Sequence, residues 1–131
     1  MYTFGEAWFL TTLLLNKEWS SLQQVIATGD VINHAIFTPD EINGALSKFI
    51  LMGYIEMDDS KNLRATSKAI ELCNKSFLNA GLFSKADKIL TQLNKSVNFN
   101  HSEIIEYFSD HEINKAYKKY AGVIKHGKNN K

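Results

Sequence analysis

One short stretch limits the fold of this chain more than any other: F-T-P-D-E-I-N-G-A-L-S-K-F-I-L-M-G-Y-I, residues 37–55. Thr38 is a preferred helix N-cap, and Glu41, three residues later, can complete a capping box with it. Pro39 suits the first helical position, where its missing N–H costs nothing. Gly53 can take the left-handed conformation that ends a helix. The stretch therefore predicts a helix whose start and stop are both encoded, followed by the first residues of a strand.

The predicted helix, residues 39–52, has two different faces. Apolar residues at helical spacing define the face that we expect to be buried: Ile42, Ala45, Leu46, Phe49 and Gly53. Phe37, before the cap, can also pack on Ile42 across the start of the helix. The opposite, outward face carries Asp40, Gly44, Ser47 and Leu51, with Glu41, Asn43 and Lys48 beside them. A partner of this helix is expected to contact the outward face.

Two helices are predicted before this one. The first, from about Gly5 to Asn16, is apolar almost all the way round. We therefore expect it to be enclosed on more than one side, either by the C-terminal helices or by a second subunit. The second helix begins at Ser20 or Ser21, with a glutamine three residues later, and continues through Gly29. Its expected core face is Leu22, Val25, Ile26, Gly29, Ile32 and Ile36.

A β-hairpin is predicted after the capped helix. Apolar and polar residues alternate on both sides of a polar turn, D-D-S-K, and the apolar positions are Ile55, Met57, Leu63 and Ala65. Thr66 is expected to cap a fourth helix, which runs to about Asn74. Two or three further helices are expected, with starts at Ser84, Ser102 and Ser109. The last of these has a capping box, formed by Ser109 and Glu112.

Length and charge limit the class of protein. With 131 residues the chain is expected to form one domain with a real core. The net charge of +1 provides no overall field for a polyanion. Residues 1–80 carry 6 basic and 9 acidic side chains, whereas residues 81–131 carry 9 and 5. Positive charge therefore gathers in the C-terminal part, where six lysines and no acid lie between Lys115 and Lys131. They are read as a solvated face, or as contacts to a DNA backbone or an acidic partner.

The remaining composition predicts a cytoplasmic protein without a membrane segment. The apolar start, A-W-F-L-T-T-L-L-L, stops at Asn16-Lys17 and is too short to span a bilayer. A single cysteine, Cys73, cannot form an internal disulfide, which suits a reducing compartment.

The order of elements resembles the winged helix-turn-helix fold: helix, helix, capped helix ending in glycine, two-stranded hairpin, helix. The runs A-L-S-K-F-I-L-M-G-Y-I-E (45–56) and L-R-A-T-S-K-A-I-E-L (63–72) are similar to the recognition helix, wing and following helix of MarR-type regulators. In such proteins a glycine and two apolar residues lead into the wing, and a Thr-x-Lys/Arg-like cap closes it. Gly53-Tyr54-Ile55 and Thr66-Ser67-Lys68 occupy those places.

This resemblance covers about residues 5–75. It implies a mainly α protein with a small β-hairpin, in which residues 1–78 form a winged helix-turn-helix core. Residues 79–131 would be a helical extension that packs on the core or forms a dimer, within one compact domain. The function implied is non-enzymatic DNA binding of the transcriptional-regulator type by a homodimer.

Two functions remain open for the outward face of helix 39–52. If it enters a major groove, Asn43, Ser47 and Lys48 are the candidate contacts to double-stranded DNA, joined by Lys61 and Arg64 from the wing. Against this, the helix has no arginine and begins with two carboxylates. The alternative is a protein-interaction module without DNA affinity, with Gly44, Ser47 and Leu51 as the contact surface. Gly44 could also be a tolerated surface glycine.

One polar cluster and several single residues complete the search. Asp30, Asn33 and His34 lie on one helix and could hold a small effector, or Asn33 could be a buried amide that satisfies a loop. The structural interpretation is favoured. The four histidines and Cys73 show no metal-ligand spacing, and no nucleophile–base pattern or glycine-rich phosphate loop is present. We therefore expect no metal, no cofactor and no enzymatic activity.

Overall fold

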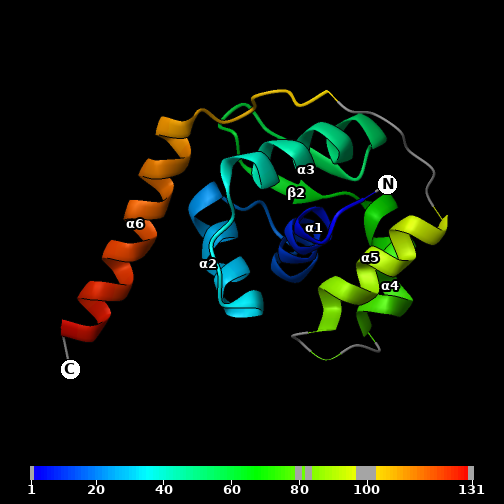
Figure 1. Ribbon diagram of the computed structural model, residues 1–131, viewed down its shortest axis with the longest axis horizontal. Coiled ribbons are helices and arrows are strands. Elements are labelled where there is room, and N and C mark those ends of the chain that lie inside the picture. The colour runs from blue at the N-terminus through cyan, green and yellow to red at the C-terminus, as the bar shows by residue number, and fades with distance from the viewer. Residues whose placement is uncertain (1, 79–80, 82–83, 97–102, 130–131) are drawn as a thin grey trace.

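The computed structural model describes residues 2–78, 81, 84–96 and 103–129. This part of the chain is mainly helical, with a small two-stranded antiparallel sheet (Figure 1). The elements in chain order are α1 (Phe4–Asn16), α2 (Leu22–Asn33), α3 (Pro39–Met52), β1 (Ile55–Met57), β2 (Leu63–Ala65), α4 (Ser67–Leu78), α5 (Lys85–Ser96) and α6 (Asp110–Asn129).

Helix α1 lies at the centre of the molecule (Figure 1). Thr3 and Glu6 form the capping box that starts it, and every residue from Gly5 to Leu14 is buried. Helices α2, α3 and α5 and strand β2 all pack against it. The first helix was expected to be covered either by C-terminal helices or by a second subunit. In the structure, α5 of the same chain packs against it.

Helix α2 packs closely against Trp8 of α1 and against Phe37 in the loop that follows it. Ser21 and Gln24 form its capping box, and the helix passes through Gly29 as predicted. The indole N–H of Trp8 donates to the carbonyl of Gly29 at 3.0 Å. The ring of Phe37 lies against the same glycine, where an added Cβ would be 2.4 Å from a ring carbon. A side chain at position 29 would therefore disturb the core. The helix stops before Ile36, which belongs to the following loop.

The hairpin forms at the predicted position. Strands β1 and β2 pair antiparallel, with Ile55 opposite Ala65 and Met57 opposite Leu63. Leu63 also exchanges both main-chain hydrogen bonds with Ser20, at 2.8 Å each, which ties the hairpin to the start of α2.

The segment before α6 differs from the prediction. A short helix starting at Ser102 was expected, but Ser102 lies outside the described residues, and residues 103–109 form an irregular, non-helical stretch with a bend at Tyr107 and Phe108. We call residues 103–109 the strap, because they run along α3 (Figure 1). Ser109 and Glu112 form the predicted capping box at the start of α6. Helix α6 packs on α2. Among the described helices, none combines the length and the apolar composition needed to cross a bilayer.

Candidate functional site

Helix α3 forms as its sequence predicts, and this determines which way its outward face points. Thr38 accepts a hydrogen bond from the N–H of Glu41, whose carboxylate accepts from the N–H of Thr38. Gly53 ends the helix with a φ of 77°. The four apolar side chains of the inward stripe are fully buried: Ile42, Ala45, Leu46 and Phe49. Gly53, which the prediction included in that stripe, is exposed.

Asn43 on the outward face is not open to solvent. The residue is only 5% exposed, and its side-chain amide pairs with the main chain of the strap. Its Nδ2 donates to the carbonyl of Phe108 at 2.9 Å, and its Oδ1 accepts from the N–H of Phe108 at 3.0 Å. Both polar atoms of the amide are therefore used by the main chain of one residue.

Ser47, one turn further along, holds a second point of the strap. It is 2% exposed. Its Oγ accepts from the N–H of Ile105 at 2.7 Å and donates to the carbonyl of Asn43 at 2.7 Å. The prediction that Asn43 and Ser47 lie on an accessible surface is wrong, because the strap covers them.

Lys48 points toward the first helix. Its Nζ lies 2.9 Å from Oε2 of Glu6, which is buried, and 5.5 Å from the ring centre of Tyr2. The pair links α3 to the first turn of α1. A side chain held in this way does not project toward a base or a phosphate.

Gly44 and Leu51, the two residues proposed for protein contact, have different surroundings. Gly44 is buried, and an added Cβ would meet a single atom, Oε2 of Glu6, at 3.8 Å. Gly44 therefore does not form part of an exposed contact surface. Leu51 is 64% exposed, and two strap residues are also exposed, Ile104 and Ile105.

The two cations of the hairpin are both paired within the chain. Nζ of Lys61 lies 3.0 Å from Glu112, donates to the carbonyl of Tyr107 and lies 5.4 Å from the ring centre of Phe108. Arg64 pairs with Glu56 at 2.6 Å and stacks on the ring of Trp19.

Glu112 therefore connects the strap, the hairpin and α6. Its pKa is lowered, first by the hydrogen bond from the backbone N–H of Ser109 and then by the hydrogen bond from Lys61. The carboxylate stays charged at neutral pH, so the ion pair with Lys61 persists there.

The polar cluster on α2 does not converge on one site. Asp30 accepts a hydrogen bond from the hydroxyl of Tyr120 at 2.6 Å, which joins α2 to α6. Burial, together with this hydrogen bond, raises the pKa of Tyr120 to about 12. Asn33 and His34 are exposed at the end of α2, so the expectation of a buried amide at Asn33 is wrong. His34 adopts a left-handed conformation with φ 52°. Within the described residues, no group of three or more metal-ligating side chains is present.

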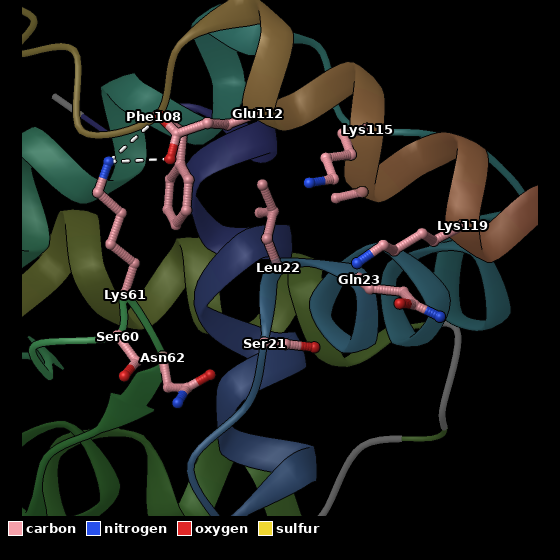
Figure 2. Close-up of a pocket in the computed structure, with 11 residues that line it drawn as sticks. Ser21, Leu22, Gln23, Ser60, Lys61, Asn62, Phe108, Glu112, Lys115 and Lys119 are labelled. Atoms are coloured by element: carbon pink, nitrogen blue, oxygen red, sulfur yellow. Dashed lines mark hydrogen bonds and ion pairs between the residues drawn. The ribbon is translucent and has the colours of Figure 1, made fainter.

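A hollow of about 370 Å³ lies beside the strap (Figure 2). It is bounded by the start of α2, the turn of the hairpin, Phe108 and the first three turns of α6. The side chains that line it include Lys61, Lys115 and Lys119.

Compared with protein-family models, curated proteins and solved structures, the chain gives no match. The interpretation of the site therefore depends on its geometry. The sequence did not predict that the strap covers the outward face of α3. One signal was available: the outward face of α3 carries two side chains that can hydrogen-bond a main chain, Asn43 and Ser47.

Proposed function

We propose that this chain is a non-enzymatic interaction module of the winged-helix type, whose α3 binds an extended polypeptide through its outward face. The observation that carries the proposal is the paired use of Asn43 and Ser47. Both side chains hydrogen-bond main-chain atoms of the strap, at Phe108 and Ile105. Main-chain recognition with an aromatic anchor is how grooves hold extended peptides. The strap occupies this surface as an internal ligand.

DNA binding through the same face stays a prediction. It requires the strap to leave, because Asn43 and Ser47 are buried beneath it. It also requires cations, since phosphate neutralisation supplies most of the non-specific affinity for DNA. The three candidate cations Lys48, Lys61 and Arg64 each pair with a carboxylate of this chain. These contacts favour a polypeptide over a nucleic acid as the partner of α3.

The test uses a synthetic peptide with the sequence of residues 103–109, E-I-I-E-Y-F-S. In the wild-type chain the strap competes with it at the high effective concentration of a tethered segment. Phe108→Ala removes the buried anchor of the strap and frees α3. Fluorescence anisotropy is expected to show peptide binding at least about tenfold tighter to this variant than to the wild-type chain. Adding Asn43→Ala to Phe108→Ala is expected to abolish the gain.

Two controls make the test decisive. Glu106→Ala changes an exposed strap residue and is expected to behave like the wild-type chain. Ile105→Pro removes the N–H group that donates a hydrogen bond to Oγ of Ser47. It is therefore a second release variant, which acts at a different residue of the strap. The proposal fails if neither release variant gains peptide binding. It also fails if the released chain instead binds mixed duplex DNA with the steep salt dependence of phosphate contacts.

The homodimer likewise stays a prediction, and its basis has changed. Because α5 covers α1, the apolar first helix no longer argues for a second subunit. Helix α6 now supports a dimer, since Tyr117 and Val123 are exposed on it. Val123→Lys is expected to shift a dimer toward monomer in sedimentation velocity.

A further inference from the structure

The hollow beside the strap has an excess of positive charge. Three lysines and one glutamate line it, which leaves two positive charges. Lys61 is paired with Glu112 across the hollow. Among the described residues, Lys115 and Lys119 have no carboxylate within ion-pair distance. Lys115 and Lys119, on successive turns of α6, therefore bring two ammonium groups without an ion-pair partner in the described part of the chain to the same hollow.

Both lysines are exposed, and their amine ends lie toward the start of α2. Figure 2 shows the amine ends of Lys115 and Lys119 pointing toward Leu22 and Gln23 at the start of α2. Side chains separated by four residues on a helix are neighbours, so two like charges here repel each other unless an anion lies between them. An anion in the hollow removes that repulsion.

The remaining walls suit a small molecule. Leu22 and Phe108 are buried apolar side chains at the edge of the hollow, and Ala116 is partly buried. Ligand sites are commonly spaces of about 300–1,000 Å³ with apolar walls and a few convergent polar groups. The hollow has such a volume, about 370 Å³, and its lining is mostly polar, with only three apolar residues. It is bounded by separate elements and has two free cations, which fits a compact anion better than a long polyanion.

We propose that this hollow binds a small dianion, a molecule bearing phosphate or carboxylate groups, between Lys115 and Lys119. The site needs the strap in place, because Phe108 of the strap forms one wall. Ser109, at the end of the strap, also hydrogen-bonds Glu112, which forms part of another wall. A ligand that binds only one of two states shifts the population toward that state. The anion therefore holds the strap on α3 and, if the proposed function holds, opposes binding of a polypeptide partner.

The binding test uses the full chain and pyrophosphate, titrated by calorimetry at constant ionic strength. The double variant Lys115→Gln/Lys119→Gln is expected to weaken binding at least about tenfold, since two charge-assisted contacts are lost. Lys88→Gln is the control, an exposed lysine of α5 that lines neither this hollow nor the neighbouring one beside α6. Its affinity is expected to stay within about twofold of the wild-type value. Citrate, titrated in parallel, separates recognition of carboxylate from recognition of phosphate.

Three results would overturn the site: no saturable binding of either anion, equal losses in the double variant and in Lys88→Gln, or much tighter binding of a short DNA duplex that the double variant loses. All three lysines are exposed, so the variants are expected to fold like the wild-type chain.

The effect on the strap is measured on the same samples without any partner. Pyrophosphate is expected to slow amide hydrogen exchange at Ile105 and Phe108, whose N–H groups bond to Ser47 and Asn43. Binding without slower exchange would overturn the coupling while leaving the anion site in place. Neither the calorimetric titration nor the hydrogen exchange depends on peptide binding. A failure of the proposed function would appear only in the peptide-binding experiment.

Discussion

Tyr2 shows how a single buried group can cost stability. Its hydroxyl is buried and has no hydrogen-bond partner among the described residues. Its ring stacks on Phe49 with 5.4 Å between centres, a contact that phenylalanine would keep. An unsatisfied buried hydroxyl costs about 1–3 kcal/mol. Tyr2→Phe is therefore expected to raise the free energy of unfolding by about 1 kcal/mol in urea denaturation. A loss of stability of similar size would show that the hydroxyl has a partner.

Cys73 predicts how stability responds to alkali. Burial raises the pKa of its thiol from 9.0 to about 12. Between these pH values the unfolded chain loses the thiol proton and the folded chain keeps it. This contribution to stability is complete below pH 9.0 and is lost as the pH rises toward about 12. The free energy of unfolding should fall above pH 9.0, with a smaller slope in Cys73→Ala. Equal slopes in the two proteins would contradict burial of the thiol.

A double-mutant cycle can measure how much the Glu6–Lys48 ion pair contributes to stability. Glu6 is buried, so Lys48→Met leaves a carboxylate without its cation and is expected to cost about 3 kcal/mol. Adding Glu6→Gln removes that charge and keeps a capping residue, so the double variant should recover part of the loss. If the two substitutions lower the free energy of unfolding additively in urea denaturation, the ion pair does not contribute to stability.

At the scale of helices, two glycines with different surroundings make a matched comparison. Gly29→Ala places a methyl group against the ring of Phe37, so it is expected to destabilise the fold by about 1–3 kcal/mol. Gly44→Ala has room for its methyl group and adds helix propensity, so it should stabilise α3 by about 0.5–1 kcal/mol. Thermal unfolding of both variants checks the signs. The same sign for both would contradict the packing around one of them.

The sequence predicted helix starts well and failed at the strap, for one physical reason. The boxes at Thr38 and Ser109 form between residues three apart, so nearby sequence is sufficient. The strap depends on partners that are distant in sequence, since Asn43 and Phe108 are 65 residues apart. Ile104, Ile105 and Phe108 also have spacing compatible with a helix. Nothing local shows that their main chain is bound elsewhere.

Across the whole molecule, C-terminal elements pack against the three N-terminal helices. Helix α5 packs on α1, the strap lies on α3, and α6 packs on α2. The sequence predicted which α3 side chains lie opposite its core, but it could not show that a segment of the same chain fills that side. Polar residues on an outward face have the same pattern whether they bind water, a partner or their own chain. The sequence therefore predicted that Asn43 and Ser47 lie opposite the core stripe of α3, but not that they are buried beneath the strap.

The central claim is that α3 holds the main chain of the strap. Amide hydrogen exchange, followed residue by residue by nuclear magnetic resonance, tests it most directly. We predict that Ile105 and Phe108 exchange at least about a hundredfold more slowly than Glu106, whose N–H has no partner among the described residues. Asn43→Ala should speed exchange at Phe108 in particular. Equally fast exchange at all three residues in the wild-type chain would contradict the claim.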